Sequence, residues 1–142
     1  MDNQSFRAAL DAFIQAWKNS SLIELETFIS PDYQAREVRD GDIEAFGFEE
    51  SVEGWKQGFA YVKGQQAEWD IREMSIIPLK EDETMVILYA TIVLDGKSME
   101  TGSMFFDTFK KGEGGWKLVR SYIETGVSFR GTDLKGGERT FF

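Results

Sequence analysis

The dipeptide Asp95-Gly96 separates two long runs of β-forming residues and restricts the fold more than any other feature of the sequence. An Asp-Gly pair between two such runs favours a two-residue hairpin turn, because both turn positions need positive φ. Strands as long as these runs curve, usually around bulges. The sequence predicts long antiparallel strands over residues 67–78, 84–94, 97–111 and 116–127.

Helical periodicity dominates the first part of the chain. Apolar residues recur on one face of residues 3–19, which predicts an amphipathic helix. Ser21 and Glu24 form a capping box that begins a short second helix. Pro31 ends this second helix near Ser30, because the residue before a proline disfavours the α conformation.

A short strand over residues 33–40 and a third helix over residues 49–63 follow. Glutamates occupy the first turn of the third helix, where the helix dipole favours carboxylates. The acidic residues of the segment 40–45 lack the ligand spacing of a calcium loop, so a solvated loop is predicted. Helices followed by a meander of strands predict one α+β domain over residues 1–142, with residues 127–142 as a C-terminal tail.

The hairpin turn also predicts a strand register. A two-residue turn places Leu94 opposite Lys97 and Tyr89 opposite Gly102. Gly102 would then either make room for a ligand or bend a curved strand. Extended through the neighbouring turns, the register forms a row of positions across four strands: Glu73, Tyr89, Gly102 and Glu124.

Both faces of the predicted sheet are largely apolar in its middle strand, so both should be covered. We expect the helices on the face that carries Tyr89, Phe106 and Tyr122. The flatter face, with Leu88 and Ala90, is predicted to pair with a second copy of the chain in a homodimer. A slip of one residue at a bulge would invert part of this assignment.

Composition removes several classes of function. The 142 residues include no cysteine and no histidine, which excludes a disulfide framework, a thiolate nucleophile and the commonest general base. A net charge of −9 argues against nucleic acid and anionic membranes as partners. No apolar stretch approaches the ~20 residues that span a bilayer, and the N-terminal residues lack a signal-peptide pattern. We therefore expect a cytoplasmic protein without a metal site or a cofactor.

A set of local signatures, taken in order, resembles the NTF2-like superfamily and in particular its SnoaL-like branch. The resemblance implies a cone, in which three N-terminal helices pack on the concave side of a strongly curved antiparallel sheet, with a cavity between them and dimerisation through the sheet. Many relatives carry histidine at the position of Arg120 or Tyr122, and this chain does not. The signatures fall within residues 3–126: the long helix at residues 6–17, the junction Ser30-Pro31-Asp32-Tyr33, a Gly-x-Glu helix entry at residues 47–55, the hairpin at Asp95-Gly96 and a strand that starts with Gly-Trp at residues 115–122.

The candidate site is a polar floor inside the apolar cone. A carboxylate there would have a raised pKa suited to proton abstraction, and a tyrosine would stabilise an enolate. The competing interpretation is a structural network in which Arg120 pairs with Glu73, Glu100 or Glu124, and the normal pairing of buried charges favours it. The predicted pocket residues are Tyr33, Trp55, Trp69, Glu73, Tyr89, Glu100, Phe106, Arg120, Tyr122 and Glu124.

Three functions remain open from the sequence, because the resemblance covers many chemistries. One is a homodimeric, SnoaL-like domain that binds a small apolar or aromatic molecule, with no catalytic residue assigned. Another is a cofactor-independent isomerase, cyclase or hydrolyase that uses a pocket carboxylate with Tyr89 or Tyr122. The last is a non-catalytic interaction module whose cavity is filled by side chains. A cavity carboxylate without an arginine partner would favour the enzyme over the binding domain.

Overall fold

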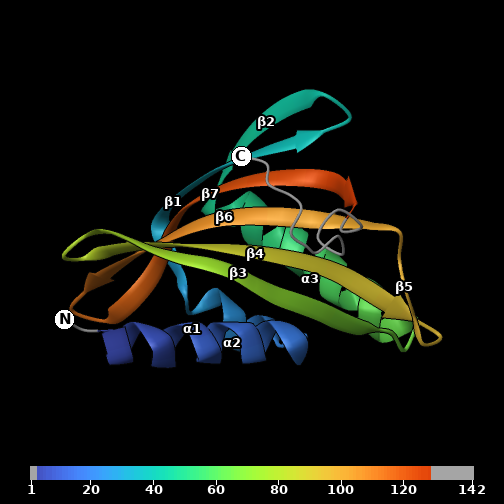
Figure 1. Cartoon of the computed structure of the whole chain (residues 1–142), viewed down its shortest axis with the longest axis horizontal. Helices are drawn as coiled ribbons and strands as arrows, with labels where there is room; N and C mark the ends of the chain where they lie inside the picture. Colours follow the sequence, from blue (N-terminus) through green and yellow to red (C-terminus); the bar gives the residue numbers. More distant parts are fainter. Residues whose placement is uncertain (1–2, 129–142) are drawn as a thin grey trace, which may run out of the picture.

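The computed structural model describes residues 3–128 of the chain. In these residues, helices and strands alternate at first and strands alone follow (Figure 1). The elements are α1 (Asn3–Lys18), α2 (Leu22–Glu26), β1 (Ile29–Arg39), β2 (Asp42–Gly47), α3 (Phe48–Gly64), β3 (Glu68–Lys80), β4 (Glu83–Leu94), β5 (Lys97–Ser98), β6 (Thr101–Gly112) and β7 (Gly115–Ser128).

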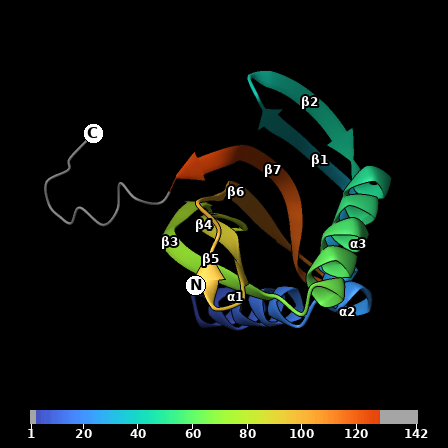
Figure 2. The same cartoon turned by 90° about the vertical axis from the view of Figure 1, so that its right-hand side faces the viewer.

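The strands form one curved sheet in the order β2-β1-β7-β6-β4-β3, with the short β5 paired to β4. The sheet bends around the three helices, which lie on its concave side (Figure 2). This arrangement confirms the predicted α+β cone. The sheet is mixed rather than wholly antiparallel, because β1 runs parallel to β7. Parallel neighbours need a long connection, and the chain from β2 to β6 supplies it. Among the described residues, no helix has the length and apolar character needed to cross a bilayer.

The segment predicted as an acidic loop is strand β2, so that prediction is wrong. Asp40 (φ 53°) and Gly41 (φ 85°) form a tight turn, and β2 returns antiparallel to β1. Asp95 (φ 55°) and Gly96 (φ 79°) form the same kind of turn between β4 and β5. Both Asp-Gly pairs in the sequence are therefore hairpin turns, as the conformational demand for positive φ predicts.

The assignment of the two sheet faces is also corrected. Leu88 and Ala90, which were predicted to meet a second subunit, are buried in the core beneath the helices with 0% and 5% exposure. Phe106 and Tyr122, which alternate with core positions, lie on the convex face instead. The aliphatic side chains of β4 on this face explain why the helices cover it, because they let the large aromatic residues of α1 and α3 pack against the sheet.

The predicted register holds only next to the turn. Leu94 pairs with Lys97 as predicted, but β5 ends at Ser98 and residues 99–100 interrupt the strand. After this interruption Tyr89 faces Met104 rather than Gly102. A second irregularity between Glu73 and Ser75 moves the first half of β3 by one position. The predicted row of Glu73, Tyr89, Gly102 and Glu124 therefore does not form.

The last strand extends slightly further than predicted. β7 continues through Ser128, so the first two residues of the predicted tail belong to a strand. The rest of that prediction lies outside the described residues.

Gly102 marks a close approach between strands β4 and β6. A Cβ built at this position would lie 2.3 Å from the carbonyl oxygen of Ala90, 2.8 Å from Cβ of Thr91 and 2.8 Å from Oη of Tyr89. All three of these atoms belong to residues of β4. Glycine is thus required here by strand packing rather than by space for a ligand.

We predict that Gly102→Ala destabilises the protein by about 1–3 kcal/mol, because the added methyl group forces strands apart. Gly54→Ala, in the middle of α3, is the matched control, since a Cβ there meets no atom within 4 Å. This control should be stabilised by about 1 kcal/mol through helix propensity. Urea denaturation of both variants checks the pair, and equal effects of the same sign would contradict the proposed strand contact.

Candidate functional site

A cavity of about 990 Å³ lies between the concave face of the sheet and helix α3. Figure 2 shows the elements around it: α3 at the right, α1 below, the strands β3, β4 and β6 opposite α3, and the β1–β2 hairpin above α3. The lining residues come from α1, α3 and every strand except β5. The two glycines Gly54 and Gly58 line the cavity on α3 and leave space beside the larger side chains of the same helix.

Aromatic rings form one wall of the cavity. Trp55 meets Trp17 edge to face with 4.8 Å between ring centroids, and it stacks on Phe105 at an interplanar angle of 16°. Trp69 packs against Trp17 at 6.0 Å and donates a hydrogen bond from Nε1 to Oγ of Ser20 at 3.0 Å. Trp17 is fully buried, whereas Trp55, Trp69 and Phe105 are only half-buried. Part of each of these three rings therefore remains uncovered by protein.

A polar cluster forms the wall next to these rings. Asp107 on β6 and Ser121 on β7 are paired across the sheet, and Oγ of Ser121 donates a hydrogen bond to Oδ1 of Asp107 at 2.6 Å. Tyr33 on β1 joins the cluster through hydrogen bonds with Ser121 and with Ser51 of α3. All four residues line the cavity. The parallel pairing of β1 with β7 is what brings Tyr33 to this place, since Ser121 pairs with Ala35, two residues further along β1.

Burial shifts the titration of both acidic groups in the cluster. Loss of hydration raises the pKa of Asp107 to about 7, and the hydrogen bond from Ser121 opposes this shift. Burial also raises the pKa of Tyr33 well above its usual value, with a further rise from the charge of Asp107. Near neutral pH the tyrosine is therefore a protonated hydrogen-bond donor, while the carboxyl of Asp107 exchanges between its two protonation states.

Charges around the cavity are mostly negative. Its lining contains four carboxylates, Asp107, Glu37, Glu44 and Glu50, and one cation, Arg39. Arg39 forms an ion pair with Glu37, and Glu50 accepts a hydrogen bond from the backbone N–H of Gly47 at 2.9 Å. Within the described part of the chain, no group of three or more His, Cys, Asp or Glu residues is placed to hold a metal ion.

Three of the ten predicted pocket residues line this cavity: Tyr33, Trp55 and Trp69. The first two lie on β1 and α3. Trp69 reaches the cavity from β3, whereas Tyr89, which was also predicted to line the pocket, does not. The irregularity after Glu73 explains this difference, because it sets Trp69 opposite Ile92 and Ile71 opposite Ala90.

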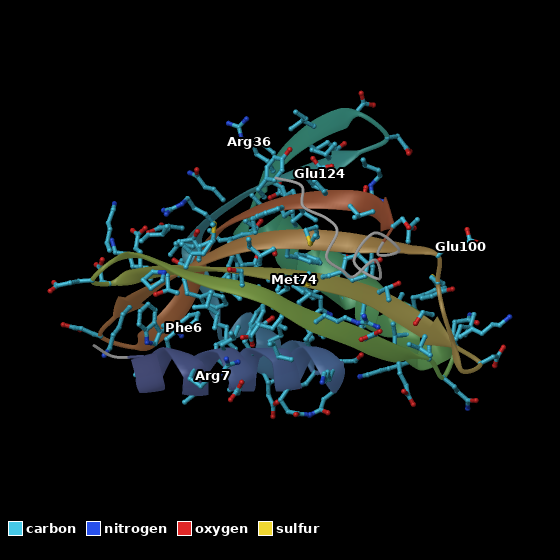
Figure 3. The ribbon with its side chains drawn as sticks, viewed as in Figure 1. Phe6, Arg7, Arg36, Met74, Glu100 and Glu124 are labelled. Atoms are coloured by element: carbon cyan, nitrogen blue, oxygen red, sulfur yellow. The ribbon has the colours of Figure 1, made fainter. Side chains whose placement is uncertain are left out.

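The predicted charged residues have partners elsewhere. Glu73 accepts a hydrogen bond from Nη2 of Arg7 on α1 at 2.7 Å, and Arg120 donates one to Glu83 at the same distance. Both side chains form ion pairs, but the predicted pairing of Arg120 with Glu73, Glu100 or Glu124 is wrong, because each has a different partner. Glu100 lies exposed between β5 and β6, at the right end of the sheet in Figure 3.

The remaining predicted residues lie on the convex side of the sheet. Oη of Tyr122 donates a hydrogen bond to Oε2 of Glu124 at 2.9 Å, and the ring of Tyr122 packs against Phe106 with centroids 6.0 Å apart. Tyr89 is buried and donates from Oη to the carbonyl oxygen of Val127 at 3.0 Å. None of these four side chains lines the cavity.

The most polar part of the cavity was missed by reasoning from sequence. Asp107 follows Phe105 and precedes Phe109 at the two-residue spacing of one strand face, and both neighbours belong to the apolar core. A single carboxylate at such a position is an unusual buried charge, and this alternation was the signal that could have identified it. Ser121 and Ser51 carry no comparable signal, because serine is common on either face of a sheet or helix.

No protein-family model matches this chain, and no curated protein does either. Several solved structures are similar to it in fold. A domain of unknown function with a cystatin-like fold from Nostoc punctiforme has a TM-score of 0.68 at 16% identity, over 91% of this chain and 80% of that one. An NTF-2-like protein of unknown function from Shewanella oneidensis has a TM-score of 0.67 at 15% identity, over 87% and 99%. A putative dehydratase of the NTF2-like family from Streptomyces avermitilis has a TM-score of 0.66 at 15% identity, over 87% and 95%.

We predict that Asp107→Asn changes how stability depends on pH. The folded pKa of Asp107 lies above its unfolded value of about 3.8, so its ionisation opposes folding and stability is lost as pH rises toward about 7. Between pH 5 and pH 8 the wild type should lose about 3 kcal/mol more than the variant, from about two pH units at 1.4 kcal/mol each. Urea denaturation at both pH values measures this difference. Glu113→Gln, in the exposed β6–β7 turn, should follow the wild type, and parallel profiles for Asp107→Asn would contradict the shift.

Proposed function

We propose, from the NTF2-like fold that this chain adopts, that it is a SnoaL-like domain that binds a small, flat and largely apolar molecule, as a homodimer in the cytoplasm. The observation that carries this proposal is the cavity of about 990 Å³, with half-buried aromatic rings on one wall and a polar cluster beside them. Sites for small molecules are typically concave and apolar, with a few polar groups that set the orientation of the ligand.

Unused hydrogen-bonding capacity supports the same proposal. Asp107 is buried, and among the described residues its carboxylate accepts a hydrogen bond only from Ser121. An ionised carboxylate can accept about four. The Nε1–H donor of Trp17, on a ring that lines the cavity, is buried without an acceptor in the described part of the chain. A ligand with a complementary polar group would satisfy Asp107, whereas the buried Nε1 of Trp17 is not accessible from the cavity.

The four tryptophans provide a test with an internal control. Trp17, Trp55 and Trp69 line the cavity, whereas Trp116 packs on Phe6 and donates from Nε1 to Ser5 at the far end of α1. We predict that 2-naphthol, a flat neutral aromatic alcohol, shifts the indole N–H signals of the first three in ¹H–¹⁵N NMR spectra and leaves Trp116 unmoved. Equal shifts of all four, or no shift at millimolar probe, would overturn the proposal.

A variant that fills the cavity sharpens this test. Ser103 lines the cavity, and Ser98 lies exposed on β5. Ser103→Phe should weaken binding of 2-naphthol at least about tenfold by occupying its space, while Ser98→Phe should leave it unchanged. If Ser103→Phe does not fold, the contrast between the cavity indoles and Trp116 in the wild type still decides the question.

One observation favours a second candidate function, a cofactor-independent isomerase, cyclase or hydrolyase. Asp107 has a pKa of about 7 and pairs with no arginine or lysine among the described residues, and Tyr33 lies beside it as a protonated donor. The carboxylate would take a proton from a carbon next to a carbonyl, the electron pair would move to the carbonyl oxygen, and Tyr33 would stabilise that oxygen. Tyr89 and Tyr122, which were considered for this role, lie on the other face of the sheet. Solvent deuterium entering a bound enolisable ketone would distinguish catalysis from binding alone.

The third function considered, an interaction module with a filled cavity, receives less support. The open volume between the sheet and α3 is large enough for a ligand of drug size. The half-exposed aromatic rings on its wall would gain further burial from such a ligand.

The proposed homodimer uses the convex face of the sheet. Phe106 and Tyr122 lie there with Ile87 and Met104, and none of the four is fully buried in the single chain. The flatter face cannot serve, because Leu88 and Ala90 are already covered by helices. A second copy seated on the convex face would remove this apolar surface from water.

We predict that the wild type sediments as a dimer and that Phe106→Glu shifts it to monomer, because an unpaired charge would be buried in the interface. Ile23, which is 81% exposed on α2 and away from the sheet, supplies the control. Ile23→Glu should remain dimeric. Sedimentation velocity over a tenfold range of concentration measures both variants, and a monomeric wild type would refute this arrangement.

A further inference from the structure

We infer that the ligand of this cavity is an organic cation, a substituted ammonium group carried on an aromatic or apolar body. This inference rests on the proposed binding function and names the chemical class that the cavity selects. Three features carry it: the balance of charge in the lining, the position of Asp107, and the aromatic wall beside that carboxylate.

The charge balance favours a positive ligand. Four carboxylates against one guanidinium leave the lining three charges negative when Asp107 is ionised, and two when it is protonated. The single cation, Arg39, is already paired with Glu37 and so cannot neutralise a ligand anion without breaking that pair. Asp107 is buried, and a low-dielectric environment strengthens its interaction with a ligand charge, whereas the exposed Glu44 and Glu50 act through water. A carboxylate or phosphate ligand would therefore be repelled and an ammonium group attracted, mainly by Asp107.

Asp107 places one of the negative charges of the lining at a defined point in the cavity wall. Its side chain is 1% exposed and lines the cavity, with a hydroxyl donor from Ser121 and no cation beside it among the described residues. A buried carboxylate is stable in its charged form only when it is paired. An ammonium group in the cavity would supply the missing partner, which a neutral or anionic ligand cannot do.

The aromatic wall adjoins this carboxylate. Phe105 lies two residues before Asp107 on the same strand face, and Trp55 stacks on Phe105. Trp69 and Trp55 both keep part of their surface uncovered. Aromatic faces attract ammonium ions through their quadrupoles, with tryptophan the strongest, and they bind the apolar body of the ligand as well. The pairing of a buried carboxylate with such rings is complementary to an organic cation.

The charged and titratable groups of the cavity lining come from few elements. Besides Asp107 on β6, Tyr33, Glu37 and Arg39 lie on β1, Glu44 on β2, and Glu50 and Tyr61 on α3, while β4 and β7 contribute no charged side chain to the lining. Of these groups, Asp107 changes its charge near neutral pH, because burial raises its pKa to about 7. A permanent cation binds the ionised form better, so its affinity should rise as pH increases through this value.

The test compares three soluble probes of similar size by ligand-observed NMR: benzyltrimethylammonium, the uncharged 2-methyl-1-phenylpropan-2-ol, and the anion phenylacetate. The cation should bind about tenfold more tightly than the alcohol at pH 8, because the ionised carboxylate of Asp107 attracts the ammonium group and not the hydroxyl. Phenylacetate should bind most weakly. From pH 6 to pH 8 the affinity for the cation should rise about tenfold, from the titration of one group near pH 7, and the affinity for the alcohol should change less than about twofold.

Two variants test whether Asp107 causes the preference for the cation. Asp107→Asn should remove both the preference for the cation and its pH dependence while retaining binding of the alcohol, whereas Glu113→Gln, outside the cavity, should change neither. Equal or tighter binding of the alcohol or of phenylacetate by the wild type would overturn the cation while leaving the binding cavity intact. Failure of all three probes, together with no response to 2-naphthol, would overturn the proposed function itself. If Asp107→Asn does not fold, the charge preference and pH dependence of the wild type decide the matter.

Discussion

Edge-to-face packing of the aromatic residues of α1 against β6 holds the two layers of this molecule together. Phe13 lies 5.3 Å from Phe109, and Trp17 lies 5.0 Å from Phe105, measured between ring centroids. Phe6 continues the same row against Phe109 at 5.7 Å. These large rings bury much of the apolar surface that drives folding, and their geometry is the one that aromatic quadrupoles favour. The position of α1 on the sheet, and hence the size of the space left under α3, depends on this row.

The same row connects the core to the cavity. Trp17 is part of the packed core, yet it also lies behind Trp55 and Trp69 on the cavity wall. Beyond it, Gly54 and Gly58 of α3 carry no side chain to fill the space between the layers, and the cavity begins there. A site built in this manner is rigid, because its wall is braced by residues that the fold requires. The polar cluster on β1, β6 and β7 is held by strand pairing, which fixes its hydroxyl and carboxyl groups equally firmly.

Sequence reasoning predicted the elements well and the faces poorly, and the reason is physical. Helical periodicity and the Asp-Gly turn are local signals, so α1, α3 and the β4–β5 hairpin were predicted close to their observed bounds. The face of a side chain depends instead on every bulge between it and a fixed point, since each bulge of one residue reverses the alternation. Irregularities in β1, β3 and β7, together with the break after Ser98, were not visible in the residues. Candidates near a helix junction, such as Tyr33 and Trp55, were therefore found, and the strand candidates Tyr89 and Tyr122 were misplaced.

The buried carboxyl group of Asp107 joins the stability of this fold to what the cavity binds. Burial raises the pKa of this carboxyl group, and the hydrogen bond from Ser121 offsets only part of the rise, so its charged form opposes folding at neutral pH. A cation bound beside it would restore the favourable energy that burial removes. Binding would then lower the pKa of Asp107 and stabilise the folded state together, because both effects arise from the same charge pair. A neutral ligand would gain only the burial of its apolar surface, and this difference is the physical basis for selectivity between ligands that share one shape.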